Sequence, residues 1–181
     1  MYLAAIEILA GKGYVQYEIS NFAQRGFRSR HNSRYWDLSD YLGFGCAAHS
    51  FYGGKRFSFT SDIRAYIAGM NGNAPIVEEA DELAFNDRVG EFVMLALRTC
   101  DGIDENAFYS RWKREFTPFA KRLEPYIASG HVKNDAGRWY LTPEGFLVSN
   151  AIIASLIEKE TDGKDHGKIA SVIYNRLNTN G

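Results

Sequence analysis

Cysteine is scarce in this chain of 181 residues, which contains only Cys46 and Cys100. Two thiolates are too few for a four-cysteine zinc site or for the ligands of a 4Fe–4S cluster. They are also too few for the disulfide framework of a small secreted domain. We therefore expect a chain without a cluster of its own, in a reducing, cytoplasmic setting.

Long apolar runs and an excess of charge of one sign are also lacking. No apolar run reaches the roughly 18–20 residues that span a bilayer, and no basic region precedes the apolar start, so neither a membrane partner nor a signal peptide is expected. Lys plus Arg number 21 and Asp plus Glu number 22, which disfavours a globally basic nucleic-acid binder. The apolar fraction of 45% is that of an ordinary globular chain.

The first third of the sequence has the pattern of the end of an αβ unit. Residues 2–10 predict a helix that Gly11 and Gly13 end, and residues 14–19 predict an aromatic, β-branched strand. The strand that would precede this helix is not in the sequence, so we expect the N-terminus to lie inside a larger fold. Residues 20–39 are polar and are expected to be irregular.

The rest of the sequence is mostly helical. A helix over 61–70 capped by Ser61 precedes a turn-rich linker, MNGNAPIV, which we take as a domain boundary. Three helices and a hairpin follow, and then a helix that Thr142 caps, which is the order of a winged-helix domain. The expected helices and hairpin cover residues 80–98, 104–112, 118–129 and 131–142.

Two segments have the composition of a binding surface. Arg25, Arg28, Arg30 and Arg34 fall within ten positions with no acidic residue among them. Guanidinium groups in such a cluster bind carboxylates or phosphates, although a solvated loop is the alternative. Residues 40–54 set glycine between aromatic residues, where a backbone can approach a ligand closely or pack as a tight buried strand.

Three spaced motifs carry a resemblance to a known family. They are YEISNFA (17–23), RHNSRYW (30–36) and DYLGFGCAAHS (40–50). The sequence resembles the oxygen-independent coproporphyrinogen III oxidase-like family of radical S-adenosylmethionine (SAM) proteins, most closely its heme chaperone branch. The likeness covers about residues 1–155 and includes the segment GRWYLTPEGFLVSNAII.

The resemblance implies an α/β fold: the C-terminal end of an incomplete (β/α) barrel over 1–70, a mostly helical winged-helix-like domain over 71–155, and a helical tail of different origin over 156–181. The family's N-terminal half, with the CxxxCxxC loop that ligates its 4Fe–4S cluster, has no counterpart here. SAM and the cluster then belong to the full-length family, and the chain alone is not expected to perform radical chemistry. The partner would be heme or a porphyrinogen, with heme binding favoured over decarboxylation.

The resemblance also implies site residues. Contacts to SAM or substrate fall on Ser33, Arg34, Ala48 and His49, with supporting roles for Asn32, Tyr35, Gly43 and Gly45. His31 and His49 are the candidate ligands of heme iron, and hydrogen-bonded structural histidines are the alternative. The aromatic pair Tyr35 and Trp36 beside the arginines suits a flat ring with carboxylates at its edge.

Two other functions remain open. One is a winged-helix module for nucleic acid or protein, with a modest basic patch at Arg111, Lys113 and Arg114; nucleic acid is the less favoured partner because acidic and apolar residues interrupt the third helix. The other follows from the tail, which resembles endolytic murein transglycosylases and would make Glu158 a general acid. A capped amphipathic helix is the favoured interpretation of that tail.

Overall fold

The computed structural model describes residues 1–72 and 74–157. The first half of the chain forms α1 (Tyr2–Ala10), β1 (Val15–Gln16), β2 (Phe22–Ala23), α2 (Arg30–Trp36), β3 (His49–Tyr52), β4 (Lys55–Phe59), α3 (Ile63–Met70) and β5 (Val77–Glu82). The second half forms α4 (Phe85–Ala96), β6 (Ile103–Asp104), α5 (Glu105–Trp112), α6 (Thr117–Ala128), β7 (Val132–Asp135), β8 (Arg138–Leu141), α7 (Pro143–Leu147) and α8 (Ser149–Ile157). The mixed α/β class is as expected.

The second half is a winged-helix unit, as the order of its elements predicts. Helices α4, α5 and α6 are followed by the β7–β8 hairpin, and β6 completes an antiparallel sheet of order β6-β8-β7. The hairpin turns at Ala136 and Gly137, whose φ angles of 52° and 88° are those of a type I′ turn. The side chain of Asp104 accepts a hydrogen bond from the Ala107 amide, and that of Thr142 from the Gly145 amide. These caps begin α5 and α7 where the sequence predicts.

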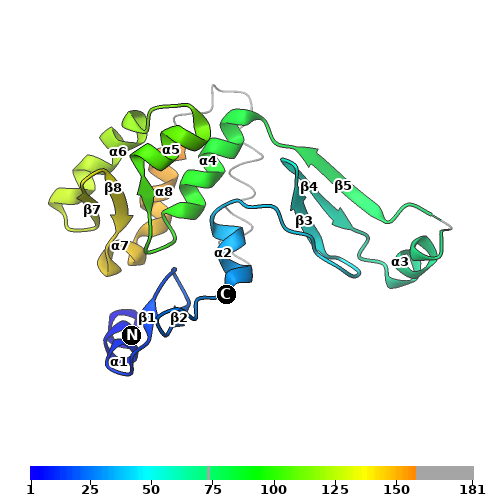
Figure 1. The fold of residues 1–181 in the computed structure, drawn as a ribbon, viewed down its shortest axis with the longest axis horizontal. Helices are drawn as coiled ribbons and strands as arrows, with labels where there is room; N and C mark the ends of the chain where they lie inside the picture. The colour runs from blue at the N-terminus through cyan, green and yellow to red at the C-terminus, as the bar shows by residue number, and fades with distance from the viewer. Residues whose placement is uncertain (73, 158–181) are drawn as a thin grey trace.

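The hydrophobic core lies in this unit. Its buried members come from α4 to α8 and the small sheet, and Leu38 and Phe51 are the members contributed by the first half. Figure 1 shows the consequence: α1 with β1 and β2 forms one projection, the β3–β4–β5 sheet with α3 forms another, and α2 lies between them beside the helical unit. The first half is therefore anchored at few points.

The strand predicted over residues 14–19 is too long. Only β1 pairs with β2, antiparallel, with Val15 opposite Ala23. The chain then pairs with the residues that follow α4: the Ile19 amide donates to the Arg98 carbonyl and the Cys100 amide to the Tyr17 carbonyl. One short segment thus serves two partners, which splits the strand.

The prediction that residues 20–39 are irregular is wrong, because they contain β2 and α2. Helix α2 begins at a serine N-cap, where the Ser29 side chain accepts a hydrogen bond from the Asn32 amide at 3.2 Å. The cap expected at Ser61 is also wrong. The carboxylate of Asp62 accepts from the Arg64 and Ala65 amides and begins α3.

The third strand of the β3–β4–β5 sheet begins at Val77, the last residue of the segment taken as a linker. β5 pairs antiparallel with β4, which delays the helix expected from residue 80 until Phe85. The boundary between 70 and 71 stays a prediction, and strands on both sides of it share this sheet. All strand pairings among residues 1–72 and 74–157 are antiparallel, whereas a (β/α) barrel is built from parallel strands. The interpretation of 1–70 as a barrel end therefore rests on the resemblance and not on strand pairing within the chain. None of the helices in this part of the protein combines the length and apolar character needed to cross a bilayer.

The guanidinium of Arg111 binds the turn that follows α2 to the helical unit. Arg111 of α5 donates to the Asp37 carbonyl at 2.7 Å and to the Leu38 carbonyl at 3.1 Å. It lies over the rings of Phe92 and Trp112, 4.7 and 5.0 Å from their centroids. Leu38 has a φ of 53°, which a branched residue adopts only where its surroundings fix it, and its side chain is buried in the core. Arg111 therefore stabilises a strained turn at the end of α2.

We expect Arg111→Ala to lower the free energy of unfolding by about 1–2 kcal/mol, because two carbonyls lose a charged donor. Arg111→Lys keeps the charge but not the two-pronged geometry, so an intermediate loss is expected. Urea unfolding followed by circular dichroism measures both. Arg64→Ala on exposed α3 is the control; equal unfolding midpoints for Arg111→Ala and the control would contradict the role assigned to Arg111.

Cys100 lies at the junction between the N-terminal segment and the helical unit. Burial, and to a smaller extent Asp101, raises the pKa of its thiol to about 11, and Arg28 partly offsets this shift. The thiolate is the reactive form, so a raised pKa leaves Cys100 protonated and slow to react at neutral pH.

In a Cys46→Ser variant, alkylation of Cys100 by iodoacetamide is therefore expected to be slow at pH 8 and to accelerate as the pH approaches 11. Mass spectrometry measures the rate. The same variant unfolded in urea should react readily at pH 8, since the thiol then has its ordinary pKa of about 8.5. Equal rates in the native and unfolded protein would show that the thiol is not buried in this way.

Candidate functional site

The exposed face of α2 presents a paired histidine and tyrosine. His31 and Tyr35 are four residues apart, which places them on one side of the helix. The Tyr35 hydroxyl is 2.8 Å from His31 Nε2, and the two rings meet edge to face at 5.0 Å. Both side chains are exposed, so the pair is open to a ligand.

Further aromatic and aliphatic side chains are exposed in the segment that follows α2. The Tyr41 ring packs edge to face against Tyr35, with 4.5 Å between centroids. After Tyr41 the chain exposes Leu42 and Phe44, whose exposed fractions are 48% and 86%. Large apolar side chains this open are unusual in a row and are typical of a surface that binds something apolar. Trp36 differs, because it packs against the core.

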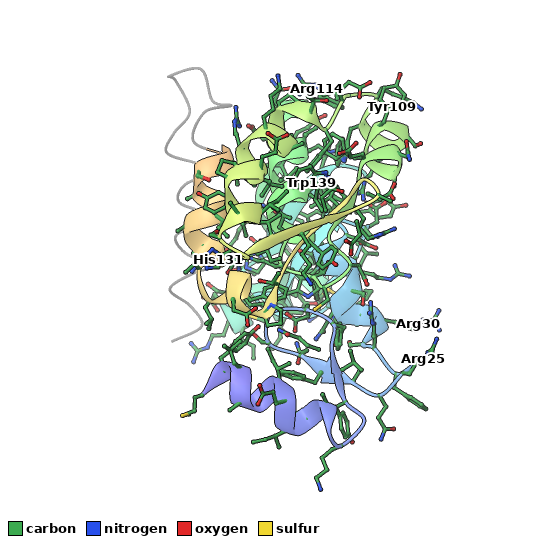
Figure 2. The ribbon with its side chains drawn as sticks, turned by 90° about the vertical axis from the view of Figure 1, so that its left-hand side faces the viewer. Arg25, Arg30, Tyr109, Arg114, His131 and Trp139 are labelled. Carbon is green, nitrogen blue, oxygen red and sulfur yellow. The ribbon has the colours of Figure 1, made fainter. Side chains whose placement is uncertain are left out.

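The arginine cluster divides into two kinds. Arg28 pairs with Asp101 at 2.6 Å, and Arg34 donates to the Asp40 carbonyl at 3.2 Å. Arg25 and Arg30 are exposed and have no hydrogen bond or ion pair in the described part of the chain. Figure 2 shows both extending outward on the same side of the molecule. Two of the four guanidinium groups are thus available to an anion.

Asn32 and Ser33, both predicted site residues, also serve the start of α2. The Asn32 amide binds the Ser29 hydroxyl, and the Ser33 hydroxyl donates to the Ser29 carbonyl at 2.8 Å. The Ser33 side chain is therefore used within the helix. A role for either residue toward SAM stays a prediction.

The glycine segment approaches its own chain. A Cβ on Gly43 would lie 2.4 Å from the His49 carbonyl oxygen, so this glycine is required by packing within the protein. Gly45 has a φ of 108° and open space around it. The Ala48 carbonyl accepts from the Phe59 amide at 2.9 Å. Tight packing accounts for Gly43 and Ala48, and their predicted contacts to a ligand remain untested.

The structure places the predicted residues in two groups. Asn32, Ser33, Arg34, Tyr35 and His31 lie on α2, whereas Gly43, Gly45, Ala48 and His49 lie on the following loop and β3. The Tyr35–Tyr41 ring contact joins the two segments. Among the residues described, no hydrogen bond or ring contact joins His49 to α2. Glu158 lies outside the described residues.

The donor set does not fit an iron–sulfur cluster. Residues 1–72 and 74–157 hold no group of three or more His, Cys, Asp or Glu side chains that suits a metal ion. α2 and the segments on either side of it offer instead an imidazole, a phenol, apolar side chains and exposed guanidinium groups. A cavity of about 310 Å³ in the helical unit, lined by Val89, Phe108, Arg114, Glu115, Pro118 and Phe119, contains none of the predicted site residues.

The winged-helix unit has little of a DNA-reading surface. On α6, Arg122 donates to the Leu156 carbonyl at 2.5 Å and the Tyr126 hydroxyl to Ser155, so this face packs against α8. Lys121 and Glu124 remain exposed, and their charges oppose each other. Arg111, part of the predicted basic patch, holds α2.

Sequence reasoning missed the His31–Tyr35 pair and the role of Arg111. To find the pair, α2 has to be predicted as a helix. The signal in the sequence for that helix is Ser29 as its N-cap. Nothing in the sequence indicates that Arg111 binds carbonyls more than 70 positions away.

Comparisons with known proteins agree with this geometry. Residues 83–148 match the family model of the HemN C-terminal domain. The chain is similar to the heme chaperone HemW of Bacillus subtilis, at 29% identity over 158 residues (87% of this chain and 42% of that protein). It is also similar to the heme chaperone HemW of Lactococcus lactis, at 30% identity over 158 residues (87% and 41%).

The fold has a counterpart among solved structures. Coproporphyrinogen III oxidase (HemN) from Escherichia coli, described as a radical SAM enzyme, superposes with a TM-score of 0.65 at 19% identity, over 86% of this chain and 39% of that chain. The chain thus spans about two fifths of the length of the relatives it matches. The sequence motifs, the winged-helix unit and these similarities together support the HemN-like family, and residues 83–148 match its C-terminal domain.

Proposed function

We propose that this chain binds heme on the exposed face of α2, as part of a heme chaperone. The observation that carries the proposal is the open His31–Tyr35 pair on α2. The same helix carries the exposed Arg30, and the exposed Arg25 lies in the segment that leads into it. The printed names of the HemW relatives support the choice of heme as cargo.

Each part of heme has a counterpart on this face. Leu42 and Phe44 offer apolar surface to the flat ring, and Tyr41 extends it toward α2. Arg25 and Arg30 pair with the propionate carboxylates, since a guanidinium binds a carboxylate through two parallel hydrogen bonds. The imidazole of His31 and the phenol of Tyr35 are the donors on α2 that would be available to the iron. The site is shallow and exposed, which suits a protein that passes its cargo on.

SAM and a 4Fe–4S cluster belong in this proposal to the full-length family. The cluster's ligands are not among the residues of this chain, so the radical chemistry would belong to the full-length protein. Heme is therefore a better partner for this part of the protein than a porphyrinogen awaiting decarboxylation. We also propose a cytoplasmic setting, in line with the two free thiols.

The double variant Arg25→Gln/Arg30→Gln is expected to weaken heme binding about three- to tenfold, because two exposed ion pairs with the propionates are lost. Titration of the full chain with ferric heme, followed by the shift of the Soret band, measures the affinity. The loss should shrink at high salt, since exposed charges are screened.

Two comparisons sharpen this test. Arg64→Gln, which removes an exposed arginine from α3, should bind heme as the unaltered chain does. Heme dimethyl ester has no free propionates, so its affinity should be the same for the double variant and the unaltered chain. An equal loss for both heme forms would contradict propionate recognition by these arginines.

A further inference from the structure

The cavity in the helical unit is lined by none of the predicted site residues. Its volume is about 310 Å³, and exposed residues form its rim. Small-molecule sites in proteins have volumes of about 300–1,000 Å³, so the cavity can hold one small ligand. Figure 2 shows Arg114, which lines the cavity, far from Arg25 and Arg30. A ligand in this cavity would therefore occupy a different part of the molecule from one held by those two arginines.

The inner wall of the cavity is apolar. It is formed by Val89 of α4, Phe108 of α5 and Phe119 of α6, whose side chains are all buried. The ring of Phe116 packs against both aromatic members of this wall, with its centroid 5.2 Å from that of Phe108 and 5.6 Å from that of Phe119. Close packing of this kind keeps side chains in place, so the apolar space exists before a ligand enters it.

Two side chains of opposite charge stand at the rim. Arg114 and Glu115 follow each other in the loop between α5 and α6, and both are exposed. No ion pair joins either of them to a group in residues 1–72 or 74–157. Arg114 is oriented by α4, because its Nη1 donates to Asn86 Oδ1 at 3.0 Å and its guanidinium lies 5.7 Å from the ring centroid of Phe85. A cation and an anion are thus available side by side at the entrance to an apolar space.

We propose that this cavity binds a free α-amino acid with a large apolar side chain. The side chain of the ligand fills the space along the inner wall, and burial of its apolar surface drives binding. The carboxylate of the ligand pairs with Arg114, since a guanidinium offers a carboxylate several N–H donors in one plane. The ammonium group of the ligand pairs with Glu115. This site and its ligand are independent of the heme-binding function proposed above.

The two rim charges are what select a free amino acid. A fatty acid or another apolar carboxylate would pair with Arg114 and place its negative charge beside Glu115, where like charges repel. The end of a peptide carries only one of the two charges, an ammonium group at the N-terminus or a carboxylate at the C-terminus. Only a ligand with both charges on one carbon gives each rim residue a partner.

The test is a titration of the ¹⁵N-labelled full chain with L-leucine at constant ionic strength, followed by NMR. The amide signals of the residues that line the cavity should shift and reach saturation. Glycine carries the same two charges without the apolar side chain, so it should bind about tenfold more weakly or less tightly still.

Two derivatives of leucine test the charges one at a time. Leucinamide lacks the carboxylate and N-acetyl-leucine lacks the ammonium group, and each should bind the unaltered chain about three- to tenfold more weakly than leucine. Arg114→Gln should lose the preference for leucine over leucinamide and keep the preference over N-acetyl-leucine. Glu115→Gln should show the reverse, because each variant removes one member of one pair. Lys121→Gln, which removes an exposed charge of α6 outside the cavity, is the matched control and should keep both preferences.

Three results with the unaltered chain would overturn the proposal, so no variant has to fold for the test to be decisive. The first is a set of signals that do not saturate with leucine. The second is equal affinity for glycine and leucine, which would show that the apolar space is not used. The third is a derivative that binds as tightly as leucine, which would assign the cavity to a peptide terminus or to another ligand with a single charge.

Discussion

The orientation of α2 depends on the guanidinium of Arg111, and the geometry of the candidate site depends on α2. Carbonyls at the C-terminal end of a helix have no partner within it, and here two of them at the turn that follows accept from Arg111. The same group lies over Phe92 and Trp112, so it connects a polar turn to the aromatic core. Leu38 adds an apolar contact at the same turn, because its carbonyl accepts from Arg111 and its side chain is buried in the core.

A seven-residue helix has little stability of its own, since short helices in water do not repay the cost of nucleation. α2 therefore needs both of its ends fixed. Ser29 caps the first turn, and Arg111 binds the turn after the last. Only with both ends fixed does the four-residue spacing of His31 and Tyr35 become a constant geometry. The geometry of the exposed pair therefore depends on the helical domain through Arg111.

The second half of the fold could be predicted from sequence because its signals are local. Asp104 and Thr142 cap helices a few residues away, and Ala136–Gly137 makes a turn by itself. The first half depends on distant partners: β5 exists because β4 pairs with it, and sequence periodicity there indicated a linker and a helix. The candidate site likewise divides into features that local sequence indicates and features that distant contacts decide. Its residues could be named from motifs, but the separation of the arginines into bound and free depends on Asp101, which lies 73 positions from Arg28.

Three charged groups of the helical unit bind other segments of the same chain. Arg111 binds the carbonyls after α2, Arg122 binds a carbonyl of α8, and Glu91 of α4 pairs with Arg56 of β4 at 2.5 Å. Each of these groups would be a natural contact for a phosphate or a partner protein if it were free. Each instead holds another segment of the same chain, in partly buried surroundings where a charged hydrogen bond is stronger than in water. In these three places the winged-helix unit uses its charges to hold segments of its own chain together. Exposed basic side chains remain elsewhere, at Arg25 and Arg30 near α2, at Arg64 on α3 and at Lys121 on α6, so the near-neutral total conceals free positive charge in both halves of the chain.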